Sequence, residues 1–192
     1  MVKEILQRNE KVLREVAKAV LIKDIGSLKI KKVLKDMAIA LEKQPDGVAI
    51  AAPQIGSSLR IFLVAGKVFD ENFLKDEDEK TSDKKTVIDS LEEKKGNHNL
   101  VFINPKILKL SREKKWVPEG CLSVRWLYGR THRSTKATIE AHNEKGEKFI
   151  RGASGLLAQI FQHETDHLNG ILFHDHAKDL KEEEDPQNQH AK

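Results

Sequence analysis

The 192-residue sequence predicts an α+β domain, and three observations support this class. Apolar residues recur at helical spacing through the first 45 residues, short strand-like segments occupy the middle, and one strongly amphipathic helix comes late. We expect antiparallel strands to pack around this late helix, with the N-terminal helices beside them. A single catalytic domain would then span residues 1–176, followed by a flexible C-terminal tail at 177–192.

The N-terminal region carries two helical patterns. Residues 10–22 place apolar side chains from Val12 to Val20 at helical spacing. Residues 27–44 repeat this spacing after Ser27, which is suited to cap a helix N-terminus. The inward-facing side chains of this second helix would be Leu28, Val33, Leu34, Met37 and Leu41. The Pro-Asp-Gly turn at 45–47 ends it.

The middle of the chain predicts extended segments. Residues 48–56 are apolar and interrupted by Pro53, residues 60–66 read as a strand, and residues 100–110 read as strand, turn and strand. Residues 136–152 alternate about an Asn-Glu-Lys-Gly turn, which predicts a hairpin. Between these segments, residues 67–99 are dense in charge and poor in large apolar groups, so we expect a solvated surface insertion.

Composition indicates the cellular compartment and the classes of partner that we expect. The 34 basic and 30 acidic residues give a net charge of +4 and are interleaved, so we expect no specific nucleic-acid partner. The single cysteine, Cys121, cannot form an internal disulfide, which favours a reducing compartment. The sequence shows neither a signal peptide nor an apolar run of membrane-spanning length. We therefore expect a cytoplasmic protein without membrane contact.

The late helix, residues 154–170, contains the strongest chemical signal. Its sequence includes His163, Glu164 and His167 in the pattern H-E-x-x-H. Positions four apart lie on one helical face, so both rings can face one cation while Glu164 lies nearby as the base for a metal-bound water. Ser154 is the expected cap, and Gly170 would lie just beyond the C-terminus.

The third ligand distinguishes classes of metalloprotein. Metzincin proteases need a histidine where this chain has Phe173, and His174 is one place off. A thermolysin-like site would need a downstream glutamate, and residues 182–184 lie in a charged tail. Cys121, in the segment Pro-Glu-Gly-Cys-Leu-Ser, is the remaining candidate, because a thiolate is a strong ligand for zinc or iron.

Addition of water to a carbonyl also needs hydrogen-bond donors for the developing oxyanion. A backbone N–H beside Cys121 is well placed, since the cysteine itself must contact the metal. The side-chain amide of Gln54, directly after Pro53, is a candidate for the second donor.

Three segments together resemble the motifs of the peptide deformylase family: GVAIAAPQ at 47–54, EGCLS at 119–123 and QHETDH at 162–167. The resemblance runs from about residue 12 to about residue 176 and includes the connecting strands. It implies removal of the formyl group from the N-terminal formylmethionine of nascent peptides, with release of formate. It also implies a ferrous ion (Fe²⁺), which Zn²⁺ or Ni²⁺ often replaces.

The resemblance further implies a role for each site residue. Cys121, His163 and His167 would hold the metal, and Glu164 would act as general base and then as proton donor to the leaving amine. Gln54 and the backbone N–H of Leu122 would bind the oxyanion. The segment from Gly47 to Ala51 would pair edgewise with the substrate backbone. The residues expected to contact substrate are Gly47, Val48, Ala49, Leu156 and Ile160.

The chain departs from the family pattern in places that keep alternatives open. The first motif usually has glycine where this chain has Ala49, and a methyl group there could crowd the substrate. This leaves a non-catalytic or altered-specificity relative as one alternative, and an H-E-x-x-H metallopeptidase as another. Arg125, Trp126 and Tyr128 could rim the cleft or be ordinary surface. The long C-terminal helix of some members is missing, so a transient ribosome contact would use other surfaces.

Overall fold

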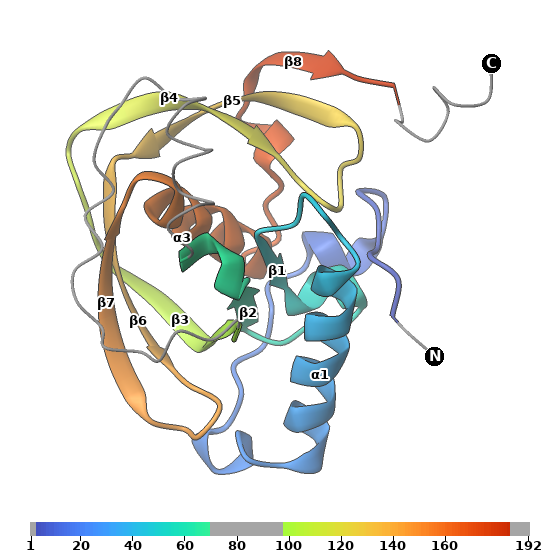
Figure 1. The fold of residues 1–192 in the computed structure, drawn as a ribbon, viewed down its shortest axis with the longest axis vertical. Coiled ribbons are helices and arrows are strands. Elements are labelled where there is room, and N and C mark those ends of the chain that lie inside the picture. Colours follow the sequence, from blue (N-terminus) through green and yellow to red (C-terminus); the bar gives the residue numbers. More distant parts are fainter. Residues whose placement is uncertain (1–2, 70–97, 185–192) are drawn as a thin grey trace.

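The computed structural model describes residues 3–69 and 98–184, and its architecture is mixed α/β with antiparallel sheets. A five-stranded sheet has the order β1-β2-β3-β6-β7 and a three-stranded sheet the order β4-β5-β8. The helix α3 contacts strands of both sheets, and α1 packs near β1 and β2 (Figure 1). The predicted α+β class is confirmed in this coarse form.

The described residues contain two α-helices, α1 at Leu28–Glu42 and α3 at Gly155–Leu168. The larger sheet comprises β1 (Ala49–Ala51), β2 (Ile61–Val64), β3 (Leu100–Leu110), β6 (Lys136–His142) and β7 (Lys148–Ser154). The smaller sheet comprises β4 (Lys114–Gly120), β5 (Leu127–Ser134) and β8 (Lys178–Glu182). Short 3₁₀ turns lie at Lys11–Arg14, Ile22–Asp24, Ala52–Ile55, Gly66–Phe69 and Phe173–Asp175.

The main core lies between α3 and the five-stranded sheet. Phe62 and Phe102 stack with ring centroids 4.5 Å apart, and Phe161 of α3 meets Phe102 edge-on at 5.2 Å. All three rings are fully buried. Burial of aromatic surface of this size is worth several kcal/mol per ring pair, so this cluster fixes α3 relative to the sheet.

The helix predicted at residues 10–22 is wrong beyond its first turn. After Lys11–Arg14 the chain is extended, and Ala17 N donates to Leu168 O at 2.9 Å while Lys18 bridges to Leu59. Val16 is 67% exposed. Tertiary hydrogen bonds to the end of α3 therefore override a weak helical pattern.

The second predicted helix is confirmed as α1, with one error in its inward face. Ser27 Oγ accepts a hydrogen bond from Ile30 N at 3.3 Å, as expected of an N-cap. Met37 and Leu41 are buried, but Leu28 is 86% exposed and Ile30 is buried in its place. The buried stripe is thus rotated relative to the one the sequence suggested.

The expected strand–turn–strand at 100–110 is one strand, β3, whose register with β6 shifts at two places. Asn104 has a φ of 52°, a conformation that asparagine tolerates, and the register with β6 shifts after Ile103. The Asn104 side chain accepts from Val20 N at 2.8 Å and donates to Val20 O at 2.7 Å. The hairpin predicted at 136–152 is confirmed by β6 and β7.

The start of the C-terminal tail and the start of the charged segment both differ from the expected boundaries. Residues 178–182, expected in a flexible tail, form β8 and pair with β5, so the tail cannot begin at 177. The charged segment begins with a 3₁₀ turn at Gly66–Phe69, and residues 70–97 lie outside the described part of the chain. The final residues, 185–192, also lie outside it.

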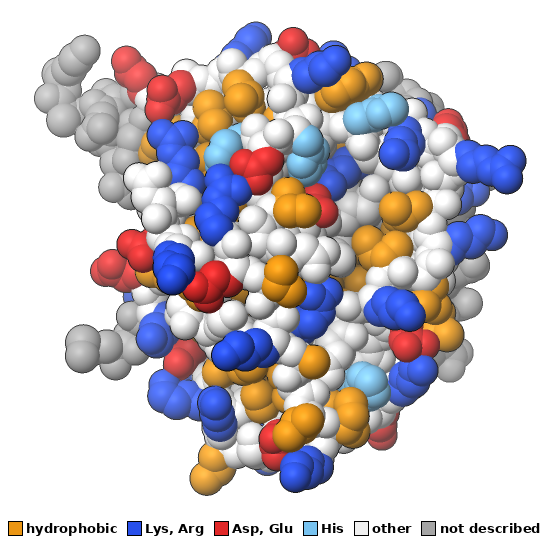
Figure 2. All heavy atoms as spheres, turned by 180° about the vertical axis from the view of Figure 1, so that it is seen from behind, with side chains coloured by type: hydrophobic (Ala, Val, Ile, Leu, Met, Phe, Trp, Pro, Cys, Tyr) orange, Lys and Arg blue, Asp and Glu red, His pale blue; other side chains and the backbone are white. Residues whose placement is uncertain are grey.

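None of the described helices is long and apolar enough to cross a membrane. On the face drawn in Figure 2, Lys and Arg side chains are spread among acidic and apolar ones rather than gathered in one stripe.

Candidate metal centre and active site

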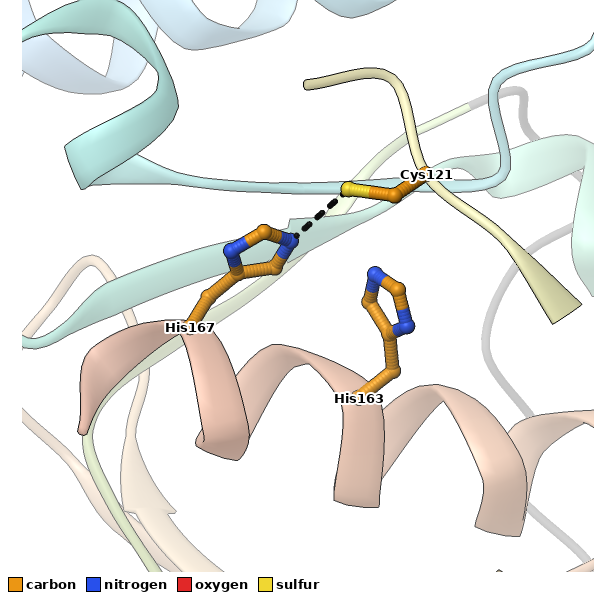
Figure 3. A group of neighbouring side chains, drawn as sticks. All are labelled: Cys121, His163 and His167. Atoms are coloured by element: carbon orange, nitrogen blue, oxygen red, sulfur yellow. Dashed lines mark hydrogen bonds between the residues drawn. The ribbon is translucent and has the colours of Figure 1, made fainter. Parts of the chain in front are cut away.

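The structure brings Cys121, His163 and His167 together. One ligand atom of each, the thiol sulfur or a ring nitrogen, lies within 4.8 Å of the others. Figure 3 shows the two rings rising from α3 toward the thiol, which lies on the segment that follows β4. The distance from Cys121 Sγ to His167 Nε2 is 3.2 Å. The three side chains could therefore hold one metal ion between them.

Local sequence explains how the three side chains come together. His163 and His167 are one helical turn apart on α3, so their rings share a face. Cys121 directly follows β4, and the preceding Gly120 lies against Tyr128, where an added Cβ would come within 2.8 Å of the ring. Glycine at 120 therefore lets the strand end close to β5 and turn the thiol toward the helix.

A buried charge network holds the His163 ring. His163 Nδ1 lies 2.7 Å from Glu119 Oε1, which leaves Nε2 to face the thiol side. Arg133 donates to both oxygens of Glu119, at 2.9 and 2.6 Å, and to Asp166 Oδ2 at 2.6 Å. Thr131 Oγ1 donates to Glu119 Oε2. Through Glu119, this network fixes the orientation of the His163 ring.

Sequence analysis did not find this network. Glu119 lies two residues before Cys121, in the segment EGCLS at 119–123. A carboxylate often accepts a hydrogen bond from a metal-binding imidazole, so this acid was a detectable signal. Arg133 has no local signal, because its role depends on the antiparallel pairing of β4 with β5.

The electrostatics of the network follow from burial and pairing. Burial alone would raise the pKa of Glu119, but hydrogen bonds from Arg133 and His163 outweigh it and hold that pKa far below its usual range. Burial would likewise lower the pKa of His163, but Cys121 and Glu119 raise it well above the ordinary value. For His167, burial dominates and its pKa is well below the ordinary value.

Glu164 is buried beside the cluster. Its Oε2 atom has no hydrogen-bond partner among the described residues. Burial raises the pKa of Glu164 to about 7, because removal from water disfavours the charged carboxylate. A carboxyl group of this pKa can accept and release a proton near neutral pH.

The two residues expected to bind the oxyanion, Gln54 and Leu122, lie close to Cys121 along the fold or the chain. Gln54 Oε1 accepts from Ala51 N at 2.8 Å, which fixes the amide so that Nε2 points toward the site. Gln54 Nε2 donates to Ser123 Oγ at 3.0 Å and lies 3.8 Å from Cys121 Sγ. Leu122 follows the thiol directly and is buried, and its carbonyl accepts from Gln7 Nε2 at 3.1 Å.

Strand β1 forms one edge of the five-stranded sheet. Val48 O accepts from Ala65 N, and the register pairs Ala49 with Val64. Backbone groups alternate in direction along an antiparallel strand, so those of Ala49 point to the open edge. Gly47, just before the strand, is packed so tightly against α1 that an added Cβ would lie 2.9 Å from Leu41 Cδ1.

The remaining expected substrate residues lie in or against the main core. Ala49 and Ile160 are buried members of it, while Val48 and Leu156 are partly buried and pack against it. The Ala49 methyl group is therefore directed into the protein. A methyl group in this position does not project from the open edge of β1, where it could crowd a substrate.

An ion pair joins the segment before β1 to the segment after Cys121. Arg125 donates to both carboxylate oxygens of Asp46, at 2.5 and 3.1 Å, and to Gln44 Oε1 at 2.8 Å. Its guanidinium also lies over the Trp126 ring, 4.8 Å from the centroid. Arg125 and Trp126 are thus part of a connection between two site-bearing segments.

Two histidines one turn apart, a thiol between sheet and helix, and a buried glutamate are typical of the sites of metal-dependent hydrolases. The family model described as polypeptide deformylase matches residues 2–183. The chain belongs to this family, whose hydrolases remove the formyl group from nascent polypeptides.

Individual relatives agree with this assignment. The chain is 34% identical over 173 residues to "Peptide deformylase 2" of Clostridium acetobutylicum, which covers 90% of this chain and 93% of the relative. It is 35% identical over 177 residues to the peptide deformylase of Carboxydothermus hydrogenoformans, covering 92% and 94%. The crystal structure of peptide deformylase from Thermotoga maritima has a TM-score of 0.71 at 29% identity, covering 93% and 99%.

A further solved structure is a class I type b peptide deformylase from Acinetobacter baumannii with Met-Ala-Ser bound. Its TM-score is 0.71 at 30% identity, covering 91% of this chain and 99% of that one.

Proposed function

We propose that this protein is an active, metal-dependent peptide deformylase in which Cys121, His163 and His167 hold the ion. The observation that carries the proposal is the convergence of their three ligand atoms within 4.8 Å, beside a buried Glu164. The match of the polypeptide deformylase family model to residues 2–183, almost the whole chain, supports the proposal.

The donor set fits Fe²⁺, with Zn²⁺ or Ni²⁺ as substitutes. Thiolate and imidazole are ligands that suit iron and zinc, and a three-ligand protein site leaves a position open. The bond between Glu119 and His163 Nδ1 directs Nε2 of that ring toward the thiol, as a metal ligand requires. When bound, such an ion polarises a carbonyl and lowers the pKa of water.

Glu164 would act as the general base and then as the acid. It would take a proton from the attacking water and deliver it to the amine that leaves with the peptide. Its raised pKa of about 7 supports both directions of transfer. Gln54 Nε2 and the Leu122 N–H would donate hydrogen bonds to the oxygen that gains negative charge.

The substrate would lie along the open edge of β1. The backbone groups of Ala49 are directed there, which suits pairing with an extended peptide over Gly47–Ala51. Val48, Leu156 and Ile160 would help form the pocket for the methionine side chain. The contacts of α3 with both sheets also support its proposed place at the centre of a single domain.

An enzyme that acts on N-formylmethionyl nascent chains would work in the cytoplasm, where these chains are made, and would contact the ribosome transiently.

Formate release from formyl-Met-Ala-Ser, with iron kept reduced, tests the proposal. We expect Glu164→Gln to abolish release while the bound metal stays at its wild-type level. Cleavage of internal peptide bonds would favour the metallopeptidase alternative. Metal binding without any formate release would favour the non-catalytic relative.

A further inference from the structure

The three-stranded sheet has two faces of opposite character. Residues that pair directly across antiparallel strands point to the same side, and successive residues alternate. One side carries Glu119, Thr131 and Arg133, which are buried and hold His163. The other side faces solvent.

The solvent side gathers cations and rings. The pairings Trp116 with His132 and Arg130 with Lys178 place these four side chains on one surface, together with Lys114 on the strand of Trp116. All five are exposed. We call Lys114, Trp116, Arg130, His132 and Lys178 the outer sheet face.

The side chains of the outer sheet face are already ordered by contacts with one another. The Trp116 and His132 rings stack with centroids 5.0 Å apart and planes 17° apart, and Lys178 Nζ lies 5.0 Å from the Trp116 centroid. Arg130 donates to Trp116 O at 3.3 Å. An acidic residue, Glu183, lies beside the start of β5, where Glu183 N donates to Trp126 O at 2.9 Å.

We propose that the outer sheet face binds single-stranded RNA without sequence preference, so the expectation of no specific nucleic-acid partner still holds. Three cations from three neighbouring strands can contact successive phosphates, and an exposed ring held in a stack offers a flat surface for a base. A membrane surface would favour apolar side chains that insert, and an acidic protein would not need the rings. Nascent polypeptides, the substrates of this family, are made on RNA, so RNA is present where these substrates arise.

The test is fluorescence anisotropy of a labelled single-stranded RNA of about 12 nucleotides, titrated with the intact chain at several salt concentrations. Three phosphate contacts predict a slope of log affinity on log salt of about −2. The triple variant Lys114→Gln, Arg130→Gln, Lys178→Gln should bind at least about ten-fold more weakly, with a slope near zero. His132→Ser should weaken binding about ten-fold and leave the slope unchanged.

A matched control removes the same charge from α1. The variant Lys29→Gln, Lys31→Gln, Lys35→Gln, whose three lysines are exposed, should bind RNA within about two-fold of the wild type. An equal loss of binding in this control would overturn the proposal, because attraction would then depend on net charge alone. Tighter binding to anionic phospholipid vesicles with the same sensitivity to the outer-face variant would also overturn it.

Formate release from a free formyl-Met peptide should be the same in both triple variants and the wild type. The RNA proposal and the proposed catalytic chemistry can therefore fail separately.

Discussion

Two arginine–carboxylate pairs lie near the site, and they differ in burial. The Arg133–Glu119 pair has side chains that are 8% and 3% exposed, whereas those of Arg125–Asp46 are 19% and 53% exposed. The first positions the His163 ring through Glu119, and the second joins two surface segments. We therefore expect loss of the first pair to reduce stability and disturb the site, and loss of the second pair to have little effect on either.

The largest expected effect on stability is that of Arg133→Met. This change leaves Glu119 buried with its main partner removed, which should cost about 3–5 kcal/mol in the free energy of unfolding. Urea denaturation measures it. The double variant Arg133→Met, Glu119→Gln is the control, and it should be more stable than Arg133→Met alone, because no unpaired charge stays buried. A loss below about 1 kcal/mol in the single variant would contradict the comparison.

Glu119→Gln should act on metal retention more than on folding. The amide oxygen can still accept from His163 Nδ1, but the loss of the negative charge reduces the basicity of the ring. We expect metal affinity to fall by about ten-fold or more. Competition with a chelator, followed by metal analysis, measures this. Unchanged affinity would show that the buried pair supports the fold alone.

Arg125→Gln should have a small effect on stability. The pair is largely solvated on the Asp46 side, so we expect a loss of at most about 1 kcal/mol in urea denaturation. Metal content should stay at the wild-type level. A destabilisation as large as that of Arg133→Met would remove the distinction between the two pairs.

The smallest expected effect concerns acid pH. The hydrogen bond from Arg125 lowers the pKa of Asp46 below its ordinary value of 3.8. The contribution of this pair to stability is thus fully present above pH 3.8 and is lost as the pH falls through the lowered pKa. The difference in Tm between wild type and Arg125→Gln should therefore shrink in that acid range. A difference that grows on acidification would contradict this sign.

The comparison also shows what sequence could reveal. The proximity of His163 and His167 was predictable because helical periodicity is local and places them on one face. The Arg133–Glu119 pair was missed because it depends on the register of β4 with β5, which brings together residues far apart along the chain. The helix predicted at residues 10–22 was wrong for a related reason, because Ala17 N donates to Leu168 O at the end of α3.

Strand β8 was missed because its sequence does not alternate between apolar and polar residues. Lys178–Glu182 is exposed throughout, and pairing with β5 comes from backbone hydrogen bonds at a sheet edge. The coarse fold class needed only the order of helical and extended patterns, which explains why it was predicted correctly.

The assignment of Cys121 as a metal ligand is tested most directly by the metal content of Cys121→Ala, purified without oxygen beside the wild type. We predict that the wild type holds a stoichiometric ion and that the variant retains less than about a tenth of it, because two imidazoles alone bind weakly. A Cys121→Ala protein that keeps a full complement of metal and releases formate at the wild-type rate would contradict the ligand assignment.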